Sequence, residues 1–474
     1  MAQLARGFFL IDSISILFNR FQHGFVMKKL LPALLVMTAS GANATDLSTI
    51  YEQAASNDAQ IAAARATREA NGYNVAIARG AILPQAQASY STTKYKADGE
   101  SASVVEFINT GSATPRSYDS EYTGQQFQIT ASQTLFNLNS WYTYQAARSA
   151  DSGYAAQLQL SEQELLLRTA QAYFDVLRAA ENLATAEAEE KAVKRSLEQT
   201  QQRYEVGLIA ITDVQEAQAT YDLTNVNLLT MQANLDVSYE ALEALTGQRY
   251  DDISPLKSDV TMAMPVPAAV SEWVDSGLNK YAGIVMAQSA KESARLQRNA
   301  TRANHLPTVS LQASYTLGDS APSYTSYPTD ANSRTIGLNI SVPLLAGGSM
   351  YAQSMQSASN LAVADYQLES QRRTVKQNVR SLYRQLQTAV QNIDARRQSI
   401  TSAETALKAT QTGYEVGTRN IVEVLDAQRQ LFSAQSLYAN ARFDYIINLL
   451  NLKFYAGTLN ENDIMVLNSW LQPS

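Results

Sequence analysis

Glu423 and Asp426 are two carboxylates three residues apart, a spacing that could support general acid–base chemistry. Such chemistry requires a substrate pocket beside the pair, and nothing in the sequence predicts one. The same residues have a structural interpretation, because Glu423 follows Asn420 by three residues, as in a capping box. Negative charge is also favourable in the first turn of a helix. For Glu423 a capping role and a functional role both stay open.

Metal and nucleophile chemistry lack the residues they need. The chain has no cysteine, and His305 is the only histidine after residue 44, so neither a zinc cluster nor a nucleophilic triad can be assembled. His305 precedes Leu306-Pro307 and is interpreted as part of a helix-to-strand junction. The net charge of −7 is spread without a run of basic residues, which disfavours nucleic acid as a partner. We therefore expect no enzyme, no metal and no cofactor.

A long internal repeat contains the acidic pair. The tetrapeptide YEVG ends at Gly207 and again at Gly417, and each glycine is interpreted as ending a helix in the left-handed conformation. LPQAQASY at Leu83 likewise matches LPTVSLQASY at Leu306. Each half then consists of a helix, two strands, a long helix, the turn and another helix. The first half is predicted at 45–250 and the second at 268–474, with 251–267 as a linker.

The strands have clean period-two alternation. Five apolar residues between Val309 and Leu317 alternate with five residues that are all Ser, Thr or Gln. We expect strands at about 84–97, 122–137, 307–318 and 334–345. Soluble hairpins could show the same pattern, but an exported chain with strands this long and polar faces this free of charge favours membrane strands. Four strands cannot close a barrel, which needs about eight, so several copies would have to share one.

The helices are too long for an ordinary globular domain. Of the 11 prolines, none lies between Pro115 and Pro255, and only Pro473 follows Pro343. Ten positions from Val375 to Leu407 alternate spacings of four and three and are apolar except for Arg396, which predicts a coiled-coil seam. A helix over roughly 139–203 would measure about 100 Å. Shorter helices at about 46–81 and 211–246 could lie end to end beside it.

The N-terminal segment has the features of an export signal. Lys28 and Lys29 precede the apolar stretch LLPALLVMTAS, and Ala42-Asn43-Ala44 fits a cleavage site, so we assign residues 1–44 to a signal sequence. Residues 1–26 precede this signal, which favours Met27 as the true start. An unusually long basic segment is the alternative.

Several of these motifs, taken together, resemble the TolC family of outer-membrane efflux and secretion channels. They are the paired LP-strand segments, GLIAITDVQ at Gly207, YEVGTRNIVEVLDAQ at Tyr414, NARFDYIINLLNLK at Asn440 and GTLNENDI at Gly457. The resemblance covers essentially the whole mature chain. It implies an internally duplicated protomer with two β-hairpins and six helices. It also implies a homotrimer whose twelve-stranded barrel in outer-membrane lipid continues into a periplasmic tunnel of twelve helices.

The resemblance also implies roles for single residues. Residues that hold the periplasmic opening shut in the family correspond to Thr212 and Asp213 at the first turn and to Tyr414 and Arg419 at the second. For Arg419, a solvated surface position is the alternative. The family's acidic aperture ring corresponds to Glu423 and Asp426, and the glutamate departs from the usual aspartate. Because Asp426 lies past the capping position, it favours the ring more clearly than Glu423 does.

The expected function is passive conduction. Threefold symmetry would gather six carboxylates around one narrow axis and favour cations there. The resemblance implies a duct for multidrug efflux and type I protein secretion that works with a periplasmic adaptor (membrane fusion) protein and an inner-membrane pump of the RND or ABC type. The alternatives are a structural or adhesive coiled-coil surface protein with a membrane β-anchor, and a soluble periplasmic scaffold.

Overall fold

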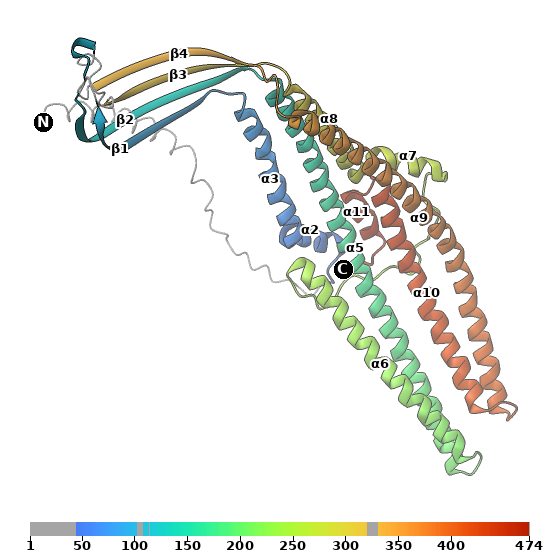
Figure 1. The fold of residues 1–474 in the computed structure, drawn as a ribbon. Coiled ribbons are helices and arrows are strands. Elements are labelled where there is room, and N and C mark those ends of the chain that lie inside the picture. Colours follow the sequence, from blue (N-terminus) through green and yellow to red (C-terminus); the bar gives the residue numbers. More distant parts are fainter. Residues whose placement is uncertain (1–43, 102–107, 113, 320–329, 474) are drawn as a thin grey trace. The chain divides into compact units, whose positions relative to one another are not determined.

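Two very long helices dominate the computed structural model, which describes residues 44–101, 108–112, 114–319 and 330–473 (Figure 1). Helix α5 (Leu138–Glu205) has 68 residues and α9 (Ser349–Glu415) has 67. At about 1.5 Å per residue each is about 100 Å long. No proline interrupts either helix, and the Asn137 side chain caps the start of α5 by accepting from the backbone N–H of Ser140 at 3.2 Å. The export signal assigned to residues 1–44 lies outside the described residues, apart from Ala44.

The described residues contain nine helices of nine residues or more, so the expectation of six helices is wrong. Besides α5 and α9, the helices are α2 (Leu47–Asn57), α3 (Ala59–Gly80), α6 (Ile211–Thr246), α7 (Val270–Lys280), α8 (Ala282–Ala303), α10 (Ile421–Tyr455) and α11 (Glu461–Ser469). Two of the additional helices arise because the helix before each strand pair is broken. The third is α11, which begins at a capping box formed by Asn460 and Asp463.

Local side chains explain both breaks. Asp58 ends α2 and starts α3 with an extended backbone, and its Oδ1 accepts from the N–H of Ile61 at 2.8 Å. Asp58 is buried and forms an ion pair with Arg168 at 3.2 Å, which fixes the chain at this point. Between α7 and α8, Tyr281 is extended and buries its ring against Phe454. A helix that continued through the first break would lose the capping bond of Asp58. One that continued through the second would lose the extended backbone that places the Tyr281 ring against Phe454.

The strands form one antiparallel sheet in the order β1-β2-β3-β4, which confirms the predicted pair of hairpins. The strands are β1 (Gln85–Ser101), β2 (Arg116–Phe136), β3 (Thr308–Asp319) and β4 (Asp330–Ser341). Strands β2 and β3 pair from Gln126 opposite Gly318 to Phe136 opposite Val309. This pairing joins the two sequence halves side by side, so β1 and β4 are the outer strands of the sheet.

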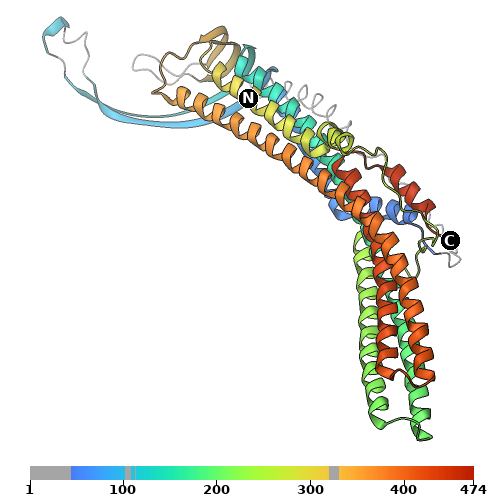
Figure 2. The ribbon, with the colours of Figure 1, turned by 90° about the vertical axis from the view of Figure 1, so that its right-hand side faces the viewer.

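The helices follow the same order as the strands. Next to the sheet, α3 contacts α5, α5 contacts α8, and α8 contacts α9. Toward the two YEVG turns, α6 contacts α5, α5 contacts α10, and α10 contacts α9 (Figures 1 and 2). Helix α9 therefore lies at one margin throughout, and α3 and α6 share the opposite margin. None of the described helices includes a stretch long and apolar enough to span a membrane.

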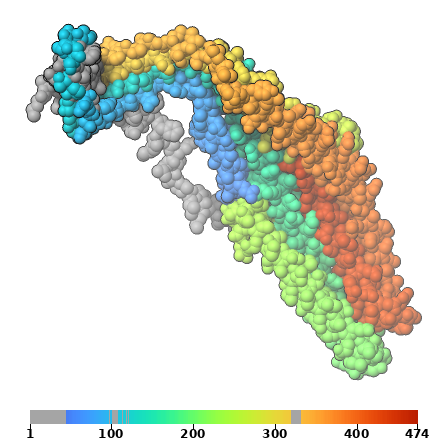
Figure 3. Space-filling view, in the orientation of Figure 1, coloured from blue at the N-terminus to red at the C-terminus, as the bar shows by residue number. Residues whose placement is uncertain are grey.

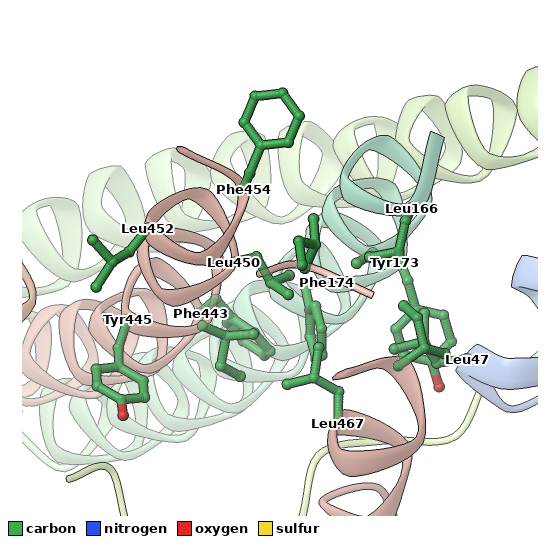
Figure 4. Packing of buried hydrophobic residues seen from close by; sticks show 14 of the residues in the cluster. Leu47, Leu166, Tyr173, Phe174, Phe443, Tyr445, Leu450, Leu452, Phe454 and Leu467 are labelled. Carbon is green, nitrogen blue, oxygen red and sulfur yellow. The ribbon is translucent and has the colours of Figure 1, made fainter. Parts of the chain in front are cut away.

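The main core lies where α5 and α10 pass the shorter helices and the linker between the two halves (Figure 4). The rings of Phe174 and Phe443 pack with their centroids 6.4 Å apart. Tyr173 is fully buried, and its hydroxyl donates to the backbone oxygen of Ser254 at 2.7 Å. Burial raises the pKa of Tyr173, so its hydroxyl stays protonated at any ordinary pH. This core holds α5, α9 and α10 together at a level that is well away from both turns.

Candidate functional site

The candidate site is the pair of turns that join α5 to α6 and α9 to α10. Gly207 and Gly417 have φ angles of 76° and 80°, a left-handed conformation that favours glycine. In the first turn the N–H of Leu208 donates to the oxygen of Arg203 at 2.9 Å. In the second the N–H of Thr418 donates to the oxygen of Gly413 at 2.8 Å. Both are Schellman-type closures, which explains why the repeated tetrapeptide builds the same turn twice.

Tyr414 links the two helical hairpins near these turns. Its ring packs on a small apolar cluster built from α5, α6 and α10, whose buried members are Val193, Leu197, Ala217, Ile421, Val424 and Leu425. The Arg203 guanidinium lies over the ring, 4.7 Å from its centroid, which is a cation–π contact. The Tyr414 hydroxyl is buried and has no hydrogen-bond partner in the described part of the chain. A buried hydroxyl without a partner is costly, and because the chain's own atoms cover it, an acceptor could reach it only if the turn rearranged.

Glu423 has the capping role that the sequence left open. The Asn420 side chain accepts from the N–H of Glu423 at 2.9 Å, and the Glu423 carboxylate accepts from the N–H of Asn420 at 3.5 Å. The same carboxylate forms an ion pair with Arg419. Hydrogen bonding to Arg419, helped by the Asn420 N–H, lowers the pKa of Glu423. Capping does not exclude a ring role, because the carboxylate is exposed to solvent and ionised.

Asp426 lies one turn further along α10, where Arg429 is 3.2 Å from its carboxylate. Arg429 was not predicted from the sequence, although the three-residue spacing that allows such a pair is visible in DAQR. Each acid of the predicted ring is thus accompanied by an arginine, Glu423 by Arg419 and Asp426 by Arg429. The negative electrostatic potential around Glu423 and Asp426 is therefore weaker than two carboxylates without arginine neighbours would produce.

Among the four residues predicted to hold the opening shut, no hydrogen bond or ion pair joins the first turn to the second in the described part of the chain. Arg419 lies against Gly413, and neither an ion pair nor a hydrogen bond joins it to Thr212 or Asp213 in the part of the chain that the structure describes. Thr212 donates weakly to Asp213 at 3.4 Å, in the first turn of α6. The gate contacts stay a prediction, and they would have to form between copies or in a rearranged turn.

The chemistry available at these turns is electrostatic. Among the described residues no group of three or more His, Asp or Glu side chains could hold a metal ion. Exposed carboxylates beside exposed arginines can attract or repel charged groups and can form ion pairs, but they offer no enclosed pocket for a substrate.

Comparisons with known proteins agree with this fold. A model of the outer membrane efflux protein family matches residues 50–248 and 274–458. Outer membrane protein TolC of Salmonella enteritidis is 36% identical over 461 residues, which cover 94% of this chain and 89% of that protein. The proteases secretion protein PrtF of Dickeya chrysanthemi is 28% identical, covering 94% of this chain and 95% of that protein.

Among solved structures, the channel-forming protein CusC superposes with a TM-score of 0.74 at 16% identity, covering 91% of this chain and 98% of CusC. At that identity the likeness shows the fold alone. The family match extends over both repeats, and the relatives align along nearly the whole chain. The chain therefore belongs to the outer membrane efflux protein family, and it is a channel of the Gram-negative outer membrane rather than an enzyme.

Proposed function

We propose that three copies of this chain form one exit duct, with a twelve-stranded barrel in the outer membrane and a tunnel of twelve helices in the periplasm. Substrates of multidrug efflux and of type I secretion pass through it unchanged. Energy comes from an inner-membrane pump of the RND or ABC type, joined to the duct by a periplasmic adaptor protein. Relatives named for efflux and for protease secretion support both transport roles.

One observation carries the proposal: every layer of the chain has the same two margins. Strand β1, helix α3 and helix α6 lie at one margin, while β4 and α9 lie at the other. Contact between the first margin of one copy and the second margin of the next is head-to-tail, which closes into a ring when the rotation fits. Four strands per copy also keep neighbouring strands antiparallel across each junction. A closed barrel removes the free strand edges that a membrane does not tolerate.

The sheet has the surface expected of membrane strands. On β4, Ile336, Leu338 and Ile340 are 80%, 59% and 61% exposed in the single chain and share one face. Residues such as Asn339 and Ser341 share the other face. An exposed apolar face of this kind would aggregate in water, whereas lipid satisfies it. The opposite polar face would line a water-filled lumen.

The gate of the duct is assigned to the two turns. Thr212, Asp213, Tyr414 and Arg419 hold the opening, and Glu423 and Asp426 ring it. The Tyr414 hydroxyl supports this assignment, because it has no acceptor in the described part of the chain and a rearrangement of the turns in the assembled duct would supply one. Helix ends that separate from one another would open the passage.

The same turns offer an apolar surface for the adaptor. Val206 and Leu208 at the first turn and Val416 at the second are 70%, 72% and 69% exposed. Exposed apolar side chains at the tips of two helical hairpins suit the tip of a partner coiled coil.

Residues 1–44 would direct export and be removed, leaving the repeats at 45–250 and 268–474 joined by the linker at 251–267.

Recording from planar lipid bilayers tests the proposal. Purified protein should give discrete single-channel currents that favour cations. A structural or adhesive stalk with a membrane anchor would insert without producing defined currents, and that result would reject the duct. Deleting the gene should also sensitise the cell to a dye, a detergent and several antibiotics together.

A further inference from the structure

Helix α6 carries a second coiled-coil seam that has no partner among the residues that the structure describes. Nine consecutive positions on one face alternate spacings of three and four, and all nine are exposed: Glu216, Ala219, Leu223, Val226, Thr230, Ala233, Val237, Glu240 and Ala244. Leu223, Val226 and Val237 are 69%, 62% and 67% exposed. The face that packs on α5 uses other residues, including Val214, Ala217 and Leu242. A repeat of this period predicts a helix packed along it.

Helix α9, at the opposite margin, has a basic flank. Arg373, Lys376, Arg380, Arg384 and Arg396 line the groove between α9 and α10. Arg373 is paired with Glu369, but in the described part of the chain no ion pair is formed by Lys376, Arg380 or Arg384. These basic residues form no run in the sequence, because they are spread along the helix and come together only on its surface. Figure 3 shows α6 and α9 on opposite sides of α5 and α10.

Distances along the chain place the acids of α6 and the bases of α9 at the same height. Ser196 lies 11 residues before Gly207 and Gln428 lies 11 residues after Gly417, and their side chains hydrogen-bond at 3.0 Å, so the two turns are level. Within the second hairpin, Arg397 and Tyr438 lie 20 and 21 residues from Gly417 and also bond. Residues equally far from their turns therefore face one another.

Residues on the two margins also lie at matching distances from their turns. Glu240 lies 33 residues after Gly207, and Arg384 lies 33 residues before Gly417. Glu243 and Arg380 lie 36 and 37 residues from their turns. At about 1.5 Å per residue this is about 50 Å above the turns. Opposite charges at matched height on the two margins are the complementarity that a head-to-tail contact requires.

We propose that the exposed seam of α6 in one copy packs along α9 of the next, with Glu240 and Glu243 facing Arg384 and Arg380. The inference rests on the proposed function, because it names the surface by which the ring of copies closes. The apolar positions of α6 form the centre of the contact, and the charges fix its register. Since these charges lie about 50 Å from the turns, the ring stays closed at this height while the tips separate.

Charge reversal in detergent-solubilised protein tests the seam. Glu240→Arg and Arg384→Glu each place like charges opposite one another at all three contacts, so the lifetime of the trimer is expected to fall at least about tenfold. Each copy carries both surfaces, and the double variant Glu240→Arg/Arg384→Glu should therefore restore the lifetime of the parent. Glu187→Arg on α5, which lies at neither margin, is the matched control and should change nothing.

The outcomes are separable, with the oligomer measured by native mass spectrometry over a range of salt concentrations. Recovery in the double variant supports the seam and also excludes misfolding as the cause of the single effects. Trimers whose lifetime neither reversal changes would overturn the seam. It would also be overturned if Arg384→Glu altered only the passage of anionic cargo, because the groove between α9 and α10 would then face the lumen. A parent chain that is not trimeric would instead contradict the proposed function itself.

Discussion

Tyr414→Phe isolates one predicted gate contact from its surroundings. The phenylalanine ring retains the Arg203 contact at 4.7 Å and the packing on the small apolar cluster that includes Val193 and Ile421 (the tip cluster), so only the hydroxyl is lost. In a single chain this hydroxyl is buried without a partner, and its removal should not destabilise the fold. When the turns rearrange in the closed duct, it would donate to an acceptor on a neighbouring coil, and Asp213 is the carboxylate among the four residues predicted to hold the opening.

The size of the effect follows from that difference. A hydrogen bond to a charged acceptor contributes about 1.5–3 kcal/mol. At 1.4 kcal/mol per factor of ten, losing it should raise the ratio of open to closed channels by about tenfold to a hundredfold per copy. Single-channel recording should show larger or more frequent openings, while the thermal unfolding of the protein stays unchanged.

The chain provides its own control for this experiment. Tyr204 has the same place in the first YEVG turn, but it is 43% exposed and lies outside the tip cluster. Tyr204→Phe should leave the currents unchanged. If Tyr414→Phe and Tyr204→Phe give the same currents as the parent, the hydroxyl does not hold the gate.

Three further outcomes can be checked. Asp426→Ala should weaken cation selectivity in bilayers, whereas Arg429→Ala should strengthen it, because Arg429 lies 3.2 Å from the Asp426 carboxylate and partly neutralises it. The opposite pair of effects would exclude an acidic ring at Asp426. Because Arg419 lowers the pKa of Glu423, the part of selectivity due to Glu423 should be present above pH 4.5 and be lost only as the pH falls below it, and Arg419→Ala should shift that loss upward. Gly457→Ala should destabilise the fold by about 1–3 kcal/mol or more in thermal unfolding, because φ is +67° and a Cβ would meet the Lys280 backbone at 2.5 Å; an unchanged melting temperature would contradict this.

Strong periodic patterns made much of this architecture predictable. Alternation around Val309 to Leu317 indicated strands, and the absence of proline between Pro115 and Pro255 allowed a helix as long as α5. The repeated tetrapeptides indicated both turns, because the left-handed residues at Gly207 and Gly417 favour glycine. These features depend on local chemistry, which a single sequence carries.

Features that depend on tertiary contacts were not predictable in the same way. The break at Asp58 requires knowing that its carboxylate caps α3 and pairs with Arg168, and the break at Tyr281 requires knowing that its ring is buried. Propensity alone favours uninterrupted helices there. The basic flank of α9 was invisible for a related reason, since residues four apart in a helix form a patch only when the face they share is known.

At the acidic pair, the sequence located the carboxylates but not their neutralising partners. The sequence indicates both a capping role and a ring role for Glu423, and the structure adds its ion pair with Arg419. Arg429 becomes apparent as a partner only in the structure, although its three-residue spacing from Asp426 allows the pair. Charge balance at a site depends on both signs, and exposed pairs of this kind tune a field more than they stabilise a fold.

The central claim is that no single copy can close the sheet, because β1 and β4 each have one partner strand within the described chain. The native mass of the protein, extracted from outer membranes in mild detergent, tests this most directly. We expect a particle of three copies that requires detergent to stay in solution. A monomer that is soluble without detergent would contradict the claim.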